Sequence, residues 1–463
     1  MSLHRLFSGE GLILALATVA LSAAAAPAQY GLIFNGAGPV NRSMAGVGTA
    51  TAIDSIGSVY WNPASLSGLD RSEMAFGIEL LFPQTRLAST IPAGAISGTL
   101  PASTLSGSNR GDNGVFPLPS VGLAYRPEGS PWTFGFGLFA VGGFGVNFPA
   151  STSNPLLTPQ PPNGLGLGSI FSELQVLEIT PQVSYQLTDH LSLGFGPALA
   201  LASLQVDPAV FASPDNANGN GFPTFPPGTH SRFAWGGGVE GGIYYSLDSG
   251  WRLGASVKSP RWFESFRFQS VDQVGRPRTV TFGLDIPMIV SAGAAYSGFD
   301  RWVLGVDAHY LDYNNTDGFR ASGFDATGAL QGIGWRSIWA VALGAQYQLL
   351  DSLSLRMGYS FNQNPIDNSR TSFNVASPLI VQNVLSAGAS YQVTDCFSLS
   401  LAYVHFFQNT NTGPILAPTG ALPGSSVTSV LSADSIVLGG TVRFGGARKV
   451  TPRPDNDRAD NNN

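Results

Sequence analysis

Segments in which apolar and polar residues alternate recur along most of the chain from residue 72 onward, and they limit it to an all-β fold. Residues 353–361 read Leu-Ser-Leu-Arg-Met-Gly-Tyr-Ser-Phe, so that every odd position is apolar, and residues 251–258 follow the same pattern. Successive side chains of a β-strand point to opposite faces. Each segment therefore predicts a strand with one apolar face and one face that is polar or rich in glycine.

The connections between these segments alternate between short and long. Tight turns such as Thr188-Asp189 contrast with long segments rich in Gly, Pro, Ser and Asn, such as residues 207–230 and 409–434. Outer-membrane barrels have short periplasmic turns and long external loops, whereas a soluble β-sandwich has no reason to alternate its turn lengths. We therefore expect a transmembrane antiparallel β-barrel with both chain ends on the periplasmic side. Its strands, about 14 in number, are expected at residues 72–82, 117–126, 131–148, 173–187, 190–205, 231–246, 251–268, 279–296, 301–313, 335–349, 353–363, 378–393, 397–407 and 435–444.

The composition agrees with a membrane barrel and excludes several other classes. Charged residues make up only 11% of the chain, which is about half the usual share. After the N-terminus no stretch reaches the roughly 18 apolar residues that a membrane helix needs, but a closed barrel can cross a membrane without one. The net charge of −6 leaves no basic face for nucleic acid, and the single cysteine, Cys396, excludes disulfides within the chain.

Both ends of the chain lie outside the alternating pattern. A largely apolar stretch leads to Ala26-Pro27-Ala28, which is a signal-peptide cleavage pattern, so residues 1–28 are expected to direct export and to be removed. Residues 29–70 are rich in Gly and Ala and precede the first strand. The barrel is expected to occupy residues 71–445, and the polar residues 446–463 are expected to form a disordered tail.

Charged residues also occur on the faces opposite the apolar ones, where alternation places them in the lumen. One reading is a network of paired charges that fills the barrel. The other is that one or two cations bind a substrate carboxylate, because Arg and Lys form charged hydrogen bonds with it. The candidates for this second role are Arg252, Lys258, Arg336 and Arg356, and the other charges on these faces are Glu178, Glu240, Asp307 and Arg443.

Signs of catalysis are weak. His309 lies two residues from Asp307 on one strand face, so that a serine could complete a hydrolase triad. The histidines are otherwise scattered over separate elements, and no metal-ligand spacing or phosphate-binding loop occurs. We therefore expect neither an enzyme nor a metal or cofactor.

Several segments together resemble the FadL/TodX family of outer-membrane transporters of hydrophobic compounds. Residues 46–54, beginning with Gly46, and residues 58–66, with Asn62-Pro63-Ala64 at their centre, resemble the N-terminal signature of the family. Later segments in the same register also look like family segments; they are residues 248–254, 285–288, 355–360 and 385–391.

This resemblance implies a 14-stranded barrel whose lumen is closed by an N-terminal hatch, here residues 29–70. It also implies uptake of long-chain fatty acids or hydrocarbons into an apolar pocket, and sideways release through the wall beside an inward kink in the third strand. The matching strand contains Gly142, Gly143 and Gly145, which suit a kink. They also suit a second reading, as small residues that face the lumen.

The leading interpretation is thus a transporter of hydrophobic small molecules in the cell outer membrane of a Gram-negative-type envelope. The alternatives are a general diffusion porin and a barrel enzyme or adhesin. The hatch argues for the transporter over the porin, because an open porin has no use for a plug. The expected partners are the substrate, outer-membrane lipid and the barrel-assembly machinery, and the barrel is expected to be a monomer. One departure from the family is that about 19 residues follow Phe444, where such barrels usually end at a terminal aromatic residue.

Overall fold

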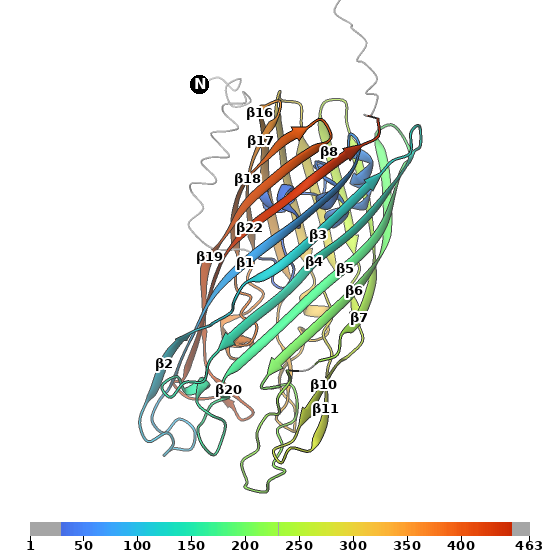
Figure 1. The fold of residues 1–463 in the computed structure, drawn as a ribbon. Coiled ribbons are helices and arrows are strands. Elements are labelled where there is room, and N and C mark those ends of the chain that lie inside the picture. Colours follow the sequence, from blue (N-terminus) through green and yellow to red (C-terminus); the bar gives the residue numbers. More distant parts are fainter. Residues whose placement is uncertain (1–28, 230, 447–463) are drawn as a thin grey trace, which may run out of the picture.

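The computed structural model describes residues 29–229 and 231–446, and its main feature is a closed antiparallel barrel (Figure 1). Within the large sheet β2 and β9 pair on one side only, and the other 14 strands form the wall. The wall strands are β1 (Ser72–Ile91), β3 (Phe116–Tyr125), β4 (Trp132–Phe148), β5 (Ile170–Gln186), β6 (Leu191–Asp207), β7 (Ala234–Ser246), β8 (Trp251–Lys258), β12 (Ile289–Tyr296), β13 (Trp302–Leu311), β16 (Ile338–Leu350), β17 (Leu353–Asn362), β18 (Asn383–Thr394), β19 (Phe397–Gly413) and β22 (Ser426–Phe444).

The smaller elements lie inside the wall or extend from it. They are the helices α2 (Pro39–Ser43) and α3 (Ser55–Trp61), the 3-10 helices η2 (Pro63–Gly68), η3 (Pro155–Leu157), η4 (Tyr313–Asn315) and η5 (Asn368–Asn374), and the strands β2 (Leu105–Arg110), β9 (Trp262–Phe263), β10 (Phe266–Val271), β11 (Pro277–Phe282), β14 (Ser322–Phe324), β15 (Leu330–Ile333), β20 (Leu416–Ala417) and β21 (Gly420–Ala421). No helix among the described residues has the length and apolar character needed to cross a membrane.

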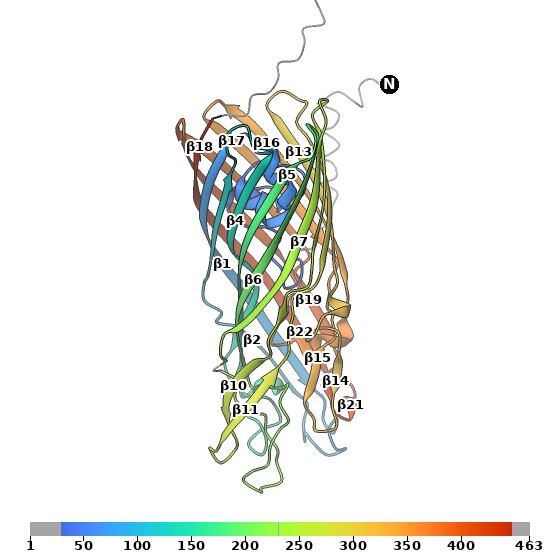
Figure 2. The same cartoon turned by 90° about the vertical axis from the view of Figure 1, so that its right-hand side faces the viewer.

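The first wall strand, β1, closes the barrel because it pairs with the last wall strand, β22, and with the second wall strand, β3. β1 pairs with β22 from Ser72↔Phe444 to Thr90↔Ser426, and it pairs with β3 on its other side. Short turns join the wall strands at one end, and long connections leave the other end (Figures 1 and 2). The prediction of a 14-stranded antiparallel barrel is confirmed. The predicted signal peptide, and the predicted tail beyond Gly446, lie outside the described residues.

Two predicted strands are wrong in their extent. The strand expected at residues 251–268 ends at Lys258, and the one expected at 279–296 begins only at Ile289. Pro260 and Pro287 lie at these boundaries, and proline has no N–H to donate to a ladder. The intervening chain forms the external β10–β11 hairpin instead (Figure 2). In contrast, the strands β1, β19 and β22 extend further toward the long loops than predicted. There β22 pairs with β1 on one side and with β19 on the other.

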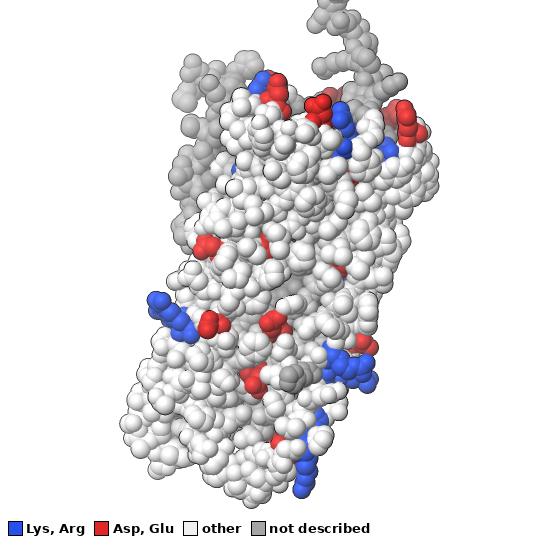
Figure 3. All heavy atoms as spheres, in the orientation of Figure 1, with Lys and Arg blue, Asp and Glu red and all other residues white. Residues whose placement is uncertain are grey.

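The outward faces of the strands are apolar, as a membrane-facing wall requires. Aromatic pairs lie beside the short turns, with ring centroids 4.6 Å apart for Trp132 and Tyr185 and 4.9 Å apart for Trp251 and Tyr296. Such residues mark a membrane interface. In Figure 3 the charged side chains gather at the end with the short turns and again beyond the middle, with an almost uncharged band between.

Residues 29–70, which we call the N-terminal segment, lie inside the barrel. Their helices α2, α3 and η2 are enclosed by the wall near the short turns (Figure 1). Nearly every residue of the segment is buried, and the side chains of Trp61 and Tyr60 are at most 1% exposed. The segment is too short to bury a core alone, and the wall supplies the rest of its core.

Candidate functional site

The Asn62-Pro63-Ala64 motif fastens the N-terminal segment to itself and to the wall. The Asn62 side-chain oxygen accepts a hydrogen bond from the Ala64 amide at 3.0 Å, which caps η2, and Pro63 occupies its first turn. The Asn62 side-chain nitrogen donates to the carbonyl of Thr49 at 2.8 Å and to that of Ile243, in β7, at 3.0 Å. One side chain therefore satisfies backbone groups of η2, of the loop at Thr49 and of one wall strand.

Other wall residues hold the backbone of the segment by charged or polar hydrogen bonds. The Asp307 carboxylate, in β13, accepts from the amides of Gly48 and Thr49, both at 2.8 Å. The Ser256 hydroxyl donates to the carbonyl of Trp61 at 2.6 Å. The N-terminal segment has little regular structure, so many of its backbone polar groups lack partners within it. These hydrogen bonds from the wall satisfy such groups, which would otherwise be costly to bury.

Glycine is required at close approaches both within the segment and between the segment and the wall. Gly46 has a φ of +89°, and a Cβ there would lie 1.4 Å from the Asn35 carbonyl oxygen. A Cβ on the wall residue Gly254 would lie 2.2 Å from the Thr49 carbonyl oxygen. The high glycine content of the chain thus has a local cause at these contacts.

The described residues do not form the hydrolase triad that the enzyme alternative requires. His309 is buried, stacks on Trp61 with centroids 4.2 Å apart, and has Nδ1 2.8 Å from the Ser291 hydroxyl. The Asp307 carboxylate is directed at the N-terminal segment instead. The two residues serve as contacts of the segment.

Buried ion pairs lie beside the N-terminal segment. Arg42 of α2 pairs with Glu79 of β1, through its Nε at 2.8 Å and through a second contact. Arg261 pairs with Glu178 at 2.7 Å and also with Glu240. We call the group of Arg261, Glu178, Glu240 and Lys258 the ion-pair cluster. Sequence reasoning missed Arg261 because this residue lies in the part of the strand predicted at residues 251–268 that does not form, since β8 ends at Lys258.

The four candidate cations occupy different surroundings. Lys258 pairs with Glu240 at 3.4 Å and lies 4.6 Å from the ring centroid of Tyr60. Arg252 donates to the carbonyl of Thr51 at 2.6 Å, and Arg356 donates to Gln346 at 2.7 Å and Ser390 at 2.6 Å. The expectation that Arg336 faces the lumen is wrong.

Arg336 is exposed, and its Nε donates to the carbonyl of Asn364 at 2.8 Å. Alternation fails there because β16 begins two residues later, at Ile338. The lumenal charges are thus a mixed set, in which some cations meet carboxylates and others meet neutral oxygen atoms. Arg443 meets Glu73 at 3.5 Å.

The third wall strand, β4, is irregular at the predicted glycines. Its ladder with β5 shifts register between Ala140 and Gly142. Its ladder with β3 ends at Ser120↔Phe139, although β4 continues to Phe148. The outer part of β4 is therefore bonded to β5 on one edge and has lost β3 on the other.

The N-terminal segment pairs with β4 at this irregularity. Ile33 forms an antiparallel bridge with Gly142. The Gly143 amide donates to the carbonyl of Leu32 at 3.2 Å, and the Phe34 amide donates to that of Val141 at 3.1 Å. A Cβ on Gly142 would lie 2.7 Å from the Leu32 carbonyl oxygen, and one on Gly145 would lie 2.4 Å from the Phe116 ring. The predicted glycines thus lie where β4 bends toward the segment.

A cavity of about 430 Å³ lies at the place where β3 and β4 separate. On the lumenal side it is lined by apolar residues of several elements, including Phe34, Leu81, Phe116, Phe144, Leu379, Phe406 and Leu431. It is also lined by residues on the outward face of the wall, which are Pro117, Pro119, Leu177, Leu201 and Phe233. One continuous space therefore reaches from the lumen to the membrane-facing side.

None of the described residues that line this cavity is charged. Its polar side chains are those of Gln29, Thr85, Gln175 and Ser203, and none of the four candidate cations lines it. A smaller apolar cavity of about 60 Å³ lies toward the external loops and shares Phe144 with it. Sequence reasoning missed these lining residues, since they come from many separate segments and no local motif marks them.

Comparison with known proteins gives one family for nearly the whole chain. Residues 16–445 match the family described as outer membrane protein transport protein (OMPP1/FadL/TodX). Outer membrane protein P1 of Haemophilus influenzae is 24% identical over 263 residues, which are 50% of this chain and 56% of that protein. The chain thus spans about half the length of the curated relatives it matches.

Solved structures share the fold. The Ralstonia pickettii toluene transporter TbuX superposes with a TM-score of 0.63 and 19% identity, over 89% of this chain and 99% of that chain. A Pseudomonas aeruginosa FadL homologue gives a TM-score of 0.65 and 15% identity, over 90% and 100%. The P. putida toluene transporter TodX gives 0.61 and 16%, over 89% and 99%.

Proposed function

The chain belongs to the OMPP1/FadL/TodX family of outer membrane transport proteins, and from this premise we propose that it moves hydrophobic small molecules through the 430 Å³ cavity and releases them sideways into the membrane. The family is one of transport channels of the outer membrane, and not of enzymes. The observation that carries the proposal is the continuity of the cavity between the lumenal and the outward faces of the wall at the β3–β4 separation.

The lining of the cavity supports a hydrophobic substrate. Each CH₂ group that leaves water for an apolar site gains about 0.8 kcal/mol, and a cavity of this size suits a small or extended apolar molecule. Because no described lining residue is charged, the cavity favours an uncharged compound, such as an aromatic hydrocarbon. A fatty acid would have to place its carboxylate outside this space. The head-group role of Arg252, Lys258, Arg336 or Arg356 stays a prediction.

Sideways release is supported by the groups that obstruct a path straight along the lumen toward the short turns. The N-terminal segment fills the lumen near the short turns, and the ion-pair cluster borders its helix α3 through Lys258 and Tyr60. An apolar molecule that moved past these groups would have to separate or desolvate buried charges, which costs several kcal/mol. The opening beside β4 offers a route lined mainly by apolar side chains, and none of the described residues that line it is charged.

A reversible closure of the opening tests this route. Pro119 and Ala140 are the first positions beyond the last β3–β4 pair, and both line the cavity. We propose a Pro119→Cys, Ala140→Cys pair in a Cys396→Ser background, with uptake of a radiolabelled hydrocarbon measured in cells that depend on this protein. Oxidation should slow uptake, and reduction should restore it.

The matched control is a Val121→Cys, Leu138→Cys pair, which joins the same strands inside their intact ladder. Its disulfide should leave uptake unchanged, because it does not cross the opening. Full cross-linking at Pro119 and Ala140 with undiminished uptake would rule out release at this site. The general-porin alternative predicts that neither cross-link matters.

A further inference from the structure

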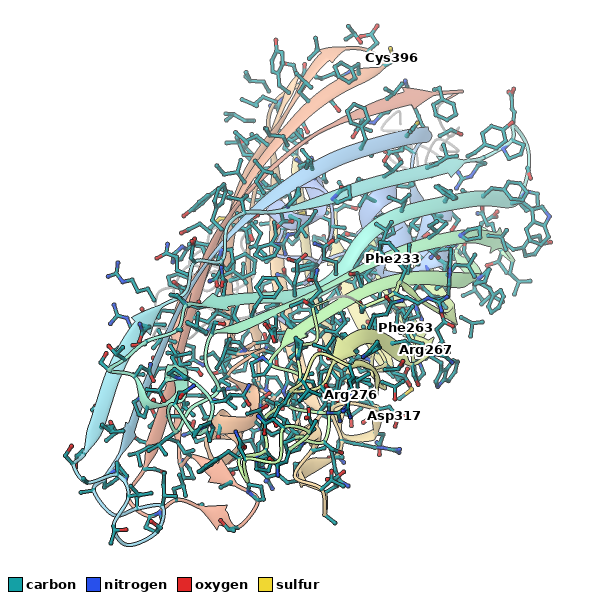
Figure 4. All side chains as sticks on the ribbon, turned by 60° about the horizontal axis from the view of Figure 1, so that its bottom comes forward. Phe233, Phe263, Arg267, Arg276, Asp317 and Cys396 are labelled. Carbon is teal, nitrogen blue, oxygen red and sulfur yellow. The ribbon has the colours of Figure 1, made fainter. Side chains whose placement is uncertain are left out.

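Two exposed arginines face each other at the external end of β7. Ser231 and Phe268 form an antiparallel bridge, and the amide of Arg232 donates to the carbonyl of Arg267 at 3.1 Å. This register places Arg232 opposite Arg267, on the side away from the buried Phe268 ring. Figure 4 shows Phe233, Phe263 and Arg267 on the same side of the barrel.

No carboxylate in the described part of the chain compensates these two positive charges. Neither arginine lies within 4.0 Å of a carboxylate of residues 29–229 or 231–446, whereas eight other contacts between an arginine or lysine and a carboxylate lie within that distance. The nearby Glu264 accepts a hydrogen bond from the amide of Trp235 at 3.1 Å. Like charges directly opposite each other destabilise a sheet, so an anion supplied from outside would stabilise this pair.

The arginines lie at the level where the outward face of the wall changes from apolar to polar. On β5 the outward residues change from Leu177 to Gln175, and on the adjacent β6 they change from Leu201 to Ser203. This change marks the boundary between lipid chains and headgroups. It is on the side of the long loops, which is the outer leaflet.

Three aromatic side chains accompany the arginines at this boundary. Phe233 is 65% exposed, Trp235 is 62% exposed and Trp262 is 59% exposed, the highest values among the large apolar residues described. Exposed aromatic residues at this depth contact the upper part of lipid chains. Their neighbours Arg232 and Arg267 then face the headgroups.

We propose that Arg232 and Arg267 bind the phosphate monoester of a phosphorylated glycolipid in the outer leaflet. A phosphate monoester carries about −1.5 to −2 charges at neutral pH and three acceptor oxygens, which matches two adjacent guanidinium groups with their paired donors. A phosphodiester, as in a glycerophospholipid, offers one charge and fits the pair less well.

The site adjoins the opening in the wall. Phe233 lines the 430 Å³ cavity and is the neighbour of Arg232 in the chain. A lipid held by the two arginines therefore places its acyl chains on the outward face beside Leu177 and Leu201, at the mouth of the cavity. The proposal stands on the arginine pair and does not depend on the route of transport.

The chain contains a matched control for this pair. Arg86 of β1 and Arg110 of β2 are direct cross-strand partners, and both are exposed. Neither makes an ion pair within 4.0 Å among the described residues. The outward neighbours of Arg86 on β1 are Gln84 and Ala88, so aromatic residues do not flank it there, and neither arginine lines the cavity.

The test measures lipid binding to the full chain in mild detergent by native mass spectrometry. The probes are lipid A with its phosphate monoesters, the same lipid after removal of the phosphates, and phosphatidylglycerol. The Arg232→Ala, Arg267→Ala variant should bind phosphorylated lipid A at least about tenfold more weakly, as expected for the loss of charged hydrogen bonds. The Arg86→Ala, Arg110→Ala variant should change binding less than about twofold.

Two further readouts complete the test. Arg232→Lys, Arg267→Lys should restore part of the binding, because the charge remains and the paired donors are lost. Heat-dependent mobility on gels checks that each variant is folded. Equal losses in the two alanine variants, or equal binding of the dephosphorylated lipid, would overturn the proposal, and so would stronger binding of phosphatidylglycerol.

Discussion

Ile33 pairs with Gly142 in an antiparallel bridge, so the N-terminal segment occupies the edge of β4 that β3 leaves unpaired. The same contact places Phe34 in the lining of the cavity. A displacement of the segment would therefore change the edge of β4 and the shape of the cavity together. The N-terminal segment and the outer part of β4 are thus joined by backbone hydrogen bonds.

Replacing Asn62 by Ala should loosen the N-terminal segment. The change removes the donors to the carbonyls of Thr49 and Ile243 and the cap of η2, and a buried group left without its partner costs about 1–3 kcal/mol. Amides of residues 46–66 should exchange at least about tenfold faster in hydrogen-exchange mass spectrometry.

The control for this change is Asn315→Ala, since Asn315 is exposed and its side chain donates only to the half-buried Asp312 in the described structure. It should leave exchange of residues 46–66 unchanged. Unaltered protection in the Asn62 variant would mean that the motif does not hold the segment in place.

Deleting residues 29–70 should open the lumen. These residues are almost entirely buried within the wall near the short turns, and the 14 wall strands pair with one another around the whole barrel without them. Single-channel conductance in planar bilayers should rise well above that of the full chain. An already large conductance that the deletion leaves unchanged would contradict the plug and favour a general porin.

Alternation made the wall predictable because it reports a physical requirement on every strand. Each strand faces lipid on one side and the lumen on the other, so residues such as Leu353 and Leu355 repeat the same environment. The rule stops at the strand ends. It therefore assigned Arg336 to the lumen although β16 begins at Ile338, and it did not single out Arg261, which follows the end of β8 at Lys258.

The cavity could not be predicted residue by residue. Phe34, Phe144 and Leu431 come from the beginning, the middle and the end of the chain, and the closure of the barrel brings them to one space. The irregular strand itself was predictable, because Gly142, Gly143 and Gly145 permit a bulge. The segment that pairs with the free edge of this strand was not predictable, since residues 29–34 show no alternating strand pattern.

Removing the lumenal arginines should distinguish two classes of substrate. We expect Arg252→Ala and Arg356→Ala to change the affinity for an uncharged hydrocarbon less than about twofold, because neither residue lines the cavity. If either arginine holds a head group, its loss should weaken fatty-acid binding by about 1.5–3 kcal/mol. Calorimetry with a fatty acid and a hydrocarbon of equal length measures both.

The Arg252→Ala change also affects the packing of the N-terminal segment. Arg252 donates to the carbonyl of Thr51 in that segment, so its loss could disturb packing. Equal losses of affinity for the two ligands would indicate this structural effect and would contradict a head-group role.

Replacing Gly142 and Gly143 by Val should impair transport without preventing barrel assembly. A Cβ at Gly142 would lie 2.7 Å from the carbonyl oxygen of Leu32, and one at Gly143 would lie 2.4 Å from that of Leu174. Both neighbours are backbone atoms, so the bulged geometry cannot accept the larger residue. The strand should move toward regular pairing, for which valine is well suited.

Two consequences should appear together in this variant. Residues 32–34 should lose their hydrogen bonds to β4, which faster amide exchange at these residues would report. Uptake of a labelled hydrocarbon should fall by about tenfold or more, since the valine side chains occupy the lining of the cavity, to which both glycines belong. The control is Gly241→Val on β7, where the nearest atom to an added Cβ is 3.8 Å away. Normal uptake by a folded Gly142→Val, Gly143→Val variant would show that neither the bulge nor its contact with Ile33 is needed for transport.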